Sequence, residues 1–211
     1  MTVNNYFIYK CRKIWYNTTM KEKLYHGSKK GGLTILKPCL SSHNKELVYL
    51  TTNEAVACIY TVNAVESLYK SKGLSYGAPF SPWYPYGFDK DKTPLLEEYY
   101  PNATRLTYEG RQGYIYLCEK PQDLGNATEI FCARTTEMPV KVFGCRKISD
   151  VYKELLEFQK SGRLVIKPNN EVSPKTIAYI ESTIKKDIEE KDLKNKPDID
   201  LAVFYREYFP A

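Results

Sequence analysis

The chain has 211 residues, of which 43% are hydrophobic and 27% charged, a composition typical of a globular protein with one good core or a core plus an appendage. No apolar run approaches the ~18 residues of a membrane span, and the first ten residues lack the features of a signal peptide, so we expect a cytoplasmic protein without a membrane partner. The six cysteines form no CxxC pair and only two histidines accompany them, so we expect no metal and free thiols.

The positive charge is concentrated at the front of the chain. Residues 1–37 contain eight lysines and arginines against one acid, Glu22, whereas the whole chain has a net charge of +6. A basic front end suits an anionic ligand such as a pyrophosphate, a nucleic acid or an acidic protein. The alternative is an ordinary solvated surface, because lysines are common there.

The first third of the chain predicts two strands and a helix after an N-terminal arm or added strand at 1–20. The expected elements are, in chain order, a strand at 23–26, a loop at 38–46, a strand at 47–51 and a helix at 54–64. Gly27-Ser28 ends the first strand as a turn signal. Asn53 is a suitable N-cap for the helix, which has an acidic residue in its first turn.

The remaining chain predicts an insertion followed by strands and then helices. Residues 65–112 are dense in Tyr, Pro and Gly, which indicates an ordered aromatic loop or a small β excursion. Beyond it we expect strands at 113–119 and 139–145 and helices at 151–159, 174–194 and 198–209. The predicted division is therefore an arm at 1–20, a domain at 21–148 that contains the insertion, and a helical C-terminal extension at 149–211 packed on the same domain.

Two tyrosines separated by eleven residues are candidates for a ligand slot. Tyr49 ends an apolar strand and Tyr60 lies in the helix that follows, so both rings can face the same gap. Two facing aromatic rings hold a flat heterocycle, and a pyridinium cation gains further attraction there. Both could equally be core aromatics, since the chain has nineteen tyrosines.

The segments Tyr25-His26-Gly27-Ser28 and Val48-Tyr49-Leu50-Thr51-Thr52, with Tyr60 beyond them, resemble the ADP-ribosyltransferase superfamily of the His-Tyr-Glu type. That superfamily includes the poly(ADP-ribose) polymerases and diphtheria-type toxins, and the front segment is also similar to the small bacterial rifamycin ADP-ribosyltransferases. The resemblance covers 24–64 and 113–152. It implies an α+β fold with an ADP-ribosyltransferase-like split β-sheet core, an early helix and a C-terminal helical extension.

The resemblance also implies roles for the residues around NAD. His26 would bind the 2′-hydroxyl of the adenosine ribose, and the backbone of Gly27 would hold the nicotinamide carboxamide. Tyr49 and Tyr60 would stack on the two faces of the nicotinamide. Ser28 and Thr51 complete the expected NAD-binding set. The polymerases have a serine three residues before the second tyrosine, and here Ala57 stands in its place.

The resemblance implies that Glu137 is the catalytic acid, beside His26 and Tyr49. A carboxylate beneath the ribose stabilises the positive charge that grows as the glycosidic bond breaks. Asp123 and Glu129 are alternatives, because the rifamycin enzymes carry an aspartate in the loop before the late strand. Glu119 is a further candidate.

The expected function is therefore that of an NAD-dependent ADP-ribosyltransferase, with NAD as co-substrate and no metal. Its acceptor is a protein, a nucleic acid or a small molecule, with an anionic acceptor slightly favoured by the basic front end. An NAD glycohydrolase that uses water, or a non-catalytic NAD-binding module on the same fold, would use the same residues. An RNA 2′-phosphotransferase would need an arginine and histidine set that the sequence lacks.

Arginines and loop aromatics are secondary candidates. Three arginines could meet the pyrophosphate of NAD, namely Arg105, Arg111 and Arg134. Aromatic residues of the insertion could stack on an acceptor or simply pack the loop onto the body, namely Trp83, Tyr84, Tyr86, Tyr99 and Tyr100.

Overall fold

The computed structural model describes residues 22–40, 45–62, 86–128 and 130–190, with side-chain detail up to residue 182. The chain divides into two compact units, one formed by 1–62 and 110–154 and the other by 63–109 and 155–211. The division expected from the sequence, with boundaries at 20 and 148 and an insertion at 65–112, stays a prediction. The expected N-terminal arm, Glu129, Trp83, Tyr84 and the helix at 198–209 lie outside the described residues.

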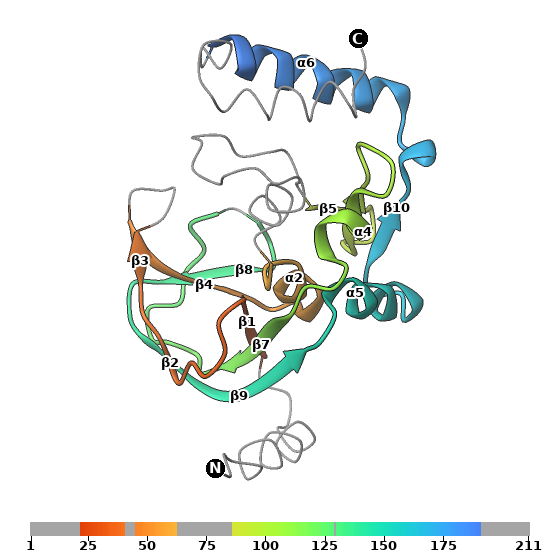
Figure 1. Cartoon of the computed structure of the whole chain (residues 1–211). Helices are drawn as coiled ribbons and strands as arrows, with labels where there is room; N and C mark the ends of the chain where they lie inside the picture. Colours follow the sequence, from red (N-terminus) through yellow and green to blue (C-terminus); the bar gives the residue numbers. More distant parts are fainter. Residues whose placement is uncertain (1–21, 41–44, 63–85, 129, 191–211) are drawn as a thin grey trace. The chain divides into compact units, whose positions relative to one another are not determined.

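The first unit is built on an antiparallel sheet with the strand order β2-β9-β7-β1-β4-β3 (Figure 1). A further strand, β8, also pairs with β4. Its strands are β1 (Leu24–Ser28), β2 (Ile35–Leu36), β3 (Cys39–Leu40), β4 (Glu46–Thr51), β7 (Gly113–Cys118), β8 (Ala133–Thr136) and β9 (Val140–Ile148). One helix of this unit, α2 (Glu54–Ile59), follows β4. The prediction of a mixed α+β protein is confirmed.

The two faces of this sheet bury different sets of side chains, as period-two alternation requires. One face carries a hydrophobic cluster made of Leu24, Leu36, Val48, Leu50, Tyr116, Cys118 and Val140. The opposite face packs against α2, whose residues Ala55 to Ile59 are all buried. The sheet is therefore covered by apolar groups on both sides at β1.

Helix α2 starts as predicted but ends earlier. The side chain of Asn53 accepts hydrogen bonds from the backbone N–H groups of Ala55 and Val56, so its predicted N-cap role is confirmed. The predicted end at residue 64 is wrong. The hydroxyl of Thr61 donates to the carbonyl oxygen of Cys58 at 2.7 Å, and the Thr61 N–H donates to the same oxygen, which closes the last turn.

Three strands of this unit are not predicted from the sequence, and β2 at Ile35–Leu36 is one of them. The predicted loop at 38–46 contains β3, which pairs with β4. Strand β8 has no apolar alternation, because two threonines, Thr135 and Thr136, occupy its buried positions. Their hydroxyl groups are satisfied by contacts with distant residues, which a local pattern does not reveal.

The second unit contains a three-stranded sheet of β5 (Tyr86–Phe88), β6 (Pro94–Glu97) and β10 (Val165–Lys167). Strands β5 and β6 form an antiparallel hairpin, whereas β10 runs parallel to β6. Its helices are α4 (Ala103–Tyr108), the larger part of α5 (Val151–Lys160), the short 3-10 helix η1 (Asn169–Glu171) and α6 (Pro174–Glu190). Part of the expected aromatic loop is therefore regular structure.

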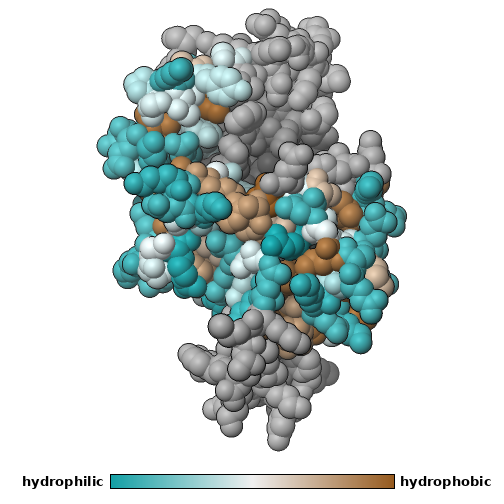
Figure 2. Space-filling view, turned by 180° about the vertical axis from the view of Figure 1, so that it is seen from behind, coloured by the Kyte–Doolittle hydropathy of each residue, from teal (hydrophilic) through white to brown (hydrophobic). Residues whose placement is uncertain are grey.

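The described surface is mixed in character, and Figure 2 shows hydrophobic patches interspersed with hydrophilic side chains on one face. Within the described ranges, no helix combines the length and the apolar character needed to cross a membrane.

Candidate functional site

Strands β1 and β4 are neighbours in the sheet, yet they pair at one position, where Tyr25 lies opposite Thr51. In contrast, β1 pairs with β7 along all five of its residues, and β4 pairs with β8 from Val48 to Thr51. The β4–β8 pair therefore diverges from the β1–β7–β9 group beyond Tyr25. We call this divergence the β1–β4 split.

The imidazole of His26 bridges the split. Its Nδ1 lies 2.8 Å from the carbonyl oxygen of Tyr49. Since a carbonyl oxygen only accepts, Nδ1 carries the hydrogen. Burial lowers the pKa of His26 below its ordinary value of 6.5, against the opposing effect of this hydrogen bond, so the ring is neutral at pH 7. Nε2 is then a hydrogen-bond acceptor, and no described residue occupies it.

Gly27 lies where β1 touches α2. A Cβ atom built at Gly27 would stand 1.9 Å from the carbonyl oxygen of Ala57 and 3.0 Å from the backbone nitrogen of Thr61. Only glycine allows this approach, because the obstructing atoms belong to the helix backbone. The packing of β1 against α2 therefore explains why glycine occupies this position, independently of any ligand.

Alternation along the strands assigns the flanking side chains to faces. Tyr25 shares the α2 face with Gly27, and the pairing of Tyr25 with Thr51 extends this face to Tyr49. His26 lies on the opposite face, where its ring centroid is 6.5 Å from that of Tyr116. His26 and Tyr49 therefore lie on opposite faces of the sheet at the split. The His26 imidazole reaches the backbone carbonyl group of Tyr49.

The two predicted stacking tyrosines differ in exposure. Tyr49 is half-buried on β4, whereas Tyr60 terminates α2 and is 57% exposed. An aromatic ring this exposed beside a buried helix contributes little to the core.

Ser28 and Thr51 have local hydrogen-bonding roles. Ser28 Oγ accepts from the N–H of Lys30 at 3.1 Å, and buried Thr51 Oγ1 accepts from the N–H of Asn53 at 3.1 Å. Each hydroxyl group keeps its own hydrogen to donate. Thr52 Oγ1 makes a longer contact, 3.4 Å, to the carbonyl oxygen of Cys132.

Tyr116 organises the glycine-rich loop after β1, a role that the sequence analysis missed. Its hydroxyl group donates to the carbonyl oxygen of Lys30 at 2.7 Å and accepts from the N–H of Leu33 at 3.3 Å. Burial raises the pKa of Tyr116 to about 12, so the hydroxyl group stays protonated. The loop is thereby fixed next to the split, although its partner is more than eighty residues away.

Glu137 follows β8 in the turn that leads to β9. Strand β8 ends at Thr136, so Glu137 lies one residue beyond the β4–β8 pair, in which Thr135 is opposite Tyr49. The Glu137 side chain is exposed and has no hydrogen bond or ion pair with any described residue. Its carboxylate is therefore available to a ligand.

Asp123, the first alternative acid, is already engaged. Its carboxylate accepts hydrogen bonds from the hydroxyl group of Thr136 and, at 2.9 Å, from the backbone N–H of Glu137. These bonds, chiefly that of Thr136, lower the pKa of Asp123 below its ordinary value. Glu119 is exposed just after β7, and Glu129 lies outside the described residues.

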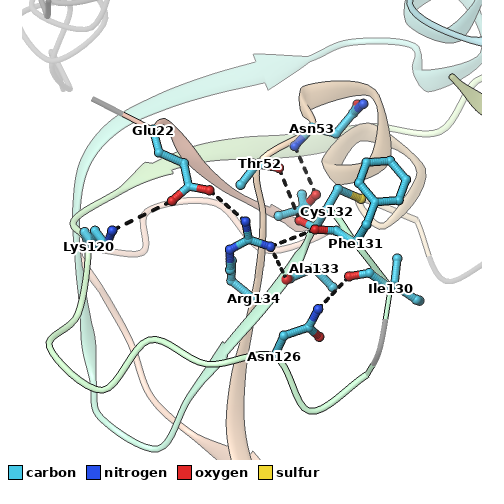
Figure 3. Close-up of polar contacts among 11 residues, drawn as sticks. Glu22, Thr52, Asn53, Lys120, Asn126, Ile130, Phe131, Cys132, Ala133 and Arg134 are labelled. Carbon is cyan, nitrogen blue, oxygen red and sulfur yellow. Dashed lines mark hydrogen bonds and ion pairs between the residues drawn. The ribbon is translucent and has the colours of Figure 1, made fainter. Parts of the chain in front are cut away.

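Arg134, one of the three candidate arginines, lies on β8, and Figure 3 shows its contacts. Its guanidinium donates to the carbonyl oxygens of Phe131 and Ala133, each at 2.8 Å, and to Glu22 at 2.8 Å. The same Glu22 carboxylate lies 3.8 Å from Lys120 Nζ. Arg134 thus ties β8 to the segment before β1 and has few donors left for a pyrophosphate.

The other two arginines are placed differently. Arg105 lies on α4 in the second unit and pairs with Glu109 at 3.0 Å. Arg111 lies just before β7, where its carbonyl oxygen accepts from the N–H of Val151.

The thiols of Cys58 and Cys118 are both buried. Burial raises the pKa of the Cys118 thiol to about 12 and also raises that of Cys58, so neither is a thiolate at neutral pH. Among the residues that the structure describes, no three His, Cys, Asp or Glu side chains gather as metal ligands.

Comparison with known proteins finds no matching family model, no matching curated protein and no matching solved structure.

Proposed function

We propose that the chain is an NAD-dependent ADP-ribosyltransferase that binds NAD at the β1–β4 split. The proposal includes the fold of the first unit, which we take to be an ADP-ribosyltransferase-like split β-sheet. The observation that carries the proposal is the divergence of β1 from β4 with neutral His26 between them. These two strands contain the segments that resemble the superfamily.

The state of His26 suits a ribose hydroxyl group. Its Nδ1 is held by Tyr49, so Nε2 presents a lone pair to an O–H donor. Because the strand carbonyl fixes the ring, this acceptor is oriented before the ligand arrives, which reduces the entropy cost of binding.

The α2 face supplies the groups that a nicotinamide ring requires. Tyr49 lies on this face of the sheet, and the exposed Tyr60 lies at the end of the helix that covers it. Stacking against a cationic pyridinium ring is favourable, and it keeps the departing nicotinamide in place.

Glu137 supplies the charge for the chemical step. The bond between the nicotinamide nitrogen and ribose C1′ breaks, and its electron pair neutralises the pyridinium as nicotinamide leaves. The Glu137 carboxylate stabilises the positive charge that develops on the ribose. The acceptor then forms a new bond at C1′ and loses a proton, for which Glu137 is a suitable base.

An anionic acceptor remains the favoured class. The loop after Ser28 carries the exposed residues Lys29 and Lys30, and Lys37 follows β2. Exposed cationic side chains attract nucleic acids or acidic proteins, and binding that depends on them weakens as salt concentration rises.

The test is the release of nicotinamide from NAD by the wild type and by two site variants. We expect Glu137→Gln to lower kcat by about 10²–10³-fold while NAD still binds. His26→Asn should keep a donor for the Tyr49 carbonyl oxygen but lose the Nε2 acceptor, so it should weaken NAD binding. Glu157→Gln is the matched control, because this exposed glutamate lies on α5 and pairs with Lys160.

The outcomes separate the alternatives. Release without added acceptor that both variants lose would indicate an NAD glycohydrolase, in which water replaces the acceptor. Saturable NAD binding that His26→Asn weakens, without any release in the presence of acceptors, would indicate a binding module. Absence of both binding and release would refute the proposal.

A further inference from the structure

The turn that contains Glu137 connects the two sides of the split. Strand β8 pairs with β4, whereas β9 pairs with β7 and β2. The three residues 137–139 therefore pass from one side of the split to the other. The conformation of this crossing determines where the Glu137 carboxylate points.

A single carboxylate holds the beginning of the crossing. One oxygen of Asp123 accepts from the Thr136 hydroxyl group and the other accepts from the Glu137 N–H at 2.9 Å. Thr136 Oγ1 in turn accepts from the N–H of Met138 at 3.0 Å. Three consecutive residues are thus tied together through Asp123, while the Glu137 side chain stays exposed.

The loop that bears Asp123 is itself anchored to β8. The backbone groups of Gly125 and Thr135 exchange two hydrogen bonds of 2.8 Å, and Thr135 Oγ1 accepts from the N–H of Ala127 at 3.0 Å. These hydrogen bonds therefore fix the backbone of the loop from which the Asp123 side chain holds the turn. An ionised carboxylate makes stronger hydrogen bonds than a neutral group, so the turn is held firmly.

We propose that Asp123 is a positioning residue which, with Thr136, fixes the backbone of Glu137 so that its carboxylate faces the split. This inference rests on the proposed function. It assigns the two acids different tasks: Glu137 acts on the ribose, whereas both oxygens of Asp123 are committed to the turn. Catalysis depends steeply on position, and an error of about 1 Å in a reacting group costs about 10²-fold in rate.

The test compares Asp123→Asn and Thr136→Val with Thr136→Ser, which keeps the hydroxyl group. We expect the first two variants to lower kcat for nicotinamide release by about 10–100-fold with KM for NAD changed less than about twofold. Thr136→Ser should retain most of the activity. Asp91→Asn is the matched control, because it makes the same chemical change at an exposed turn residue of the second unit.

A second measurement does not depend on activity. The Glu137 amide should be protected from hydrogen exchange in the wild type and exchange faster in Asp123→Asn and Thr136→Val. Unchanged exchange in both variants would show that Asp123 does not hold the turn. Faster exchange with unchanged kcat would show that the turn does not position a catalytic group.

Two further outcomes identify which proposal fails. Loss of activity in Asp123→Asn, with full activity in Glu137→Gln, would make Asp123 itself the catalytic acid and overturn the positioning role. Absence of nicotinamide release by the wild type would refute the proposed function and the catalytic part of this inference, while hydrogen exchange would still decide whether Asp123 holds the turn.

Discussion

Replacing Gly27 with alanine tests the contact between β1 and α2 that supports one side of the split. The added Cβ would lie 1.9 Å from the carbonyl oxygen of Ala57, whereas real Cβ atoms essentially never come closer than 3.0 Å to such an atom. The helix and the strand must therefore separate by about 1 Å. Neither partner can rotate away, because the obstructing atoms belong to the backbone of α2.

The cost should lie at the upper end of what overpacking produces, about 3 kcal/mol, because the separation also loosens the buried residues Ala55 to Ile59. This corresponds to a decrease of about 100-fold in the folding constant. With a urea m-value of about 2 kcal/mol/M, the unfolding midpoint should fall by about 1.5 M.

Gly125→Ala is the matched control for urea unfolding. The nearest atoms to its added Cβ are the carbonyl oxygens of Asp123 and Thr135, both at 3.9 Å, which is ordinary contact. Its free energy of unfolding should change by less than about 1 kcal/mol. Equal stability of Gly27→Ala and Gly125→Ala would refute the close approach of β1 and α2.

Two further predictions concern charge. Because the pKa of His26 in the folded state is lowered below 6.5, its contribution to stability is present above pH 6.5 and is lost as the pH falls through the folded pKa. His26→Asn should abolish this pH dependence of the free energy of unfolding, measured by urea unfolding. A pH dependence that persists in His26→Asn would contradict the assignment to His26. Arg146 lies between Glu54 at 2.8 Å and Glu154 at 2.7 Å, so Arg146→Met should remove the cation that two partly buried carboxylates share and lower the free energy of unfolding by about 1–3 kcal/mol. The double change Glu54→Gln with Glu154→Gln in Arg146→Met should recover part of this loss, and no recovery would count against the ion-pair explanation.

Local sequence patterns predicted the strands that border the split because the information is local there. Strands β1, β4 and β7 have apolar residues at alternate or consecutive buried positions, and Asn53 marks the start of α2 with a short polar side chain. The end of α2 depends on one hydroxyl group, that of Thr61, which no periodicity signals.

The parts of the site that the sequence did not reveal depend on contacts between distant residues. Asp123 meets Thr136 and Glu137 across thirteen and fourteen positions, and Tyr116 meets Lys30 across eighty-six. An aspartate before a glycine turn and a tyrosine in a strand are ordinary by themselves. Their roles exist because the sheet brings their elements together, which single-sequence patterns do not encode.

A residue that packing fully explains is poor evidence for a ligand, and this separates the members of the candidate site. Gly27 is required by Ala57, and Thr51 caps the turn before α2. Folding does not explain the exposed ring of Tyr60 in the same way, because 57% of it faces solvent.

Tyr60→Ala should therefore change the free energy of unfolding by less than about 1 kcal/mol yet weaken NAD binding about tenfold, a loss of about 1.4 kcal/mol of stacking. Tyr179→Ala, which removes a 60% exposed ring from α6, is the control that should leave NAD binding unchanged. Equal NAD affinity of Tyr60→Ala and the wild type, measured by calorimetry, would remove Tyr60 from the site and leave the nicotinamide ring with Tyr49 alone.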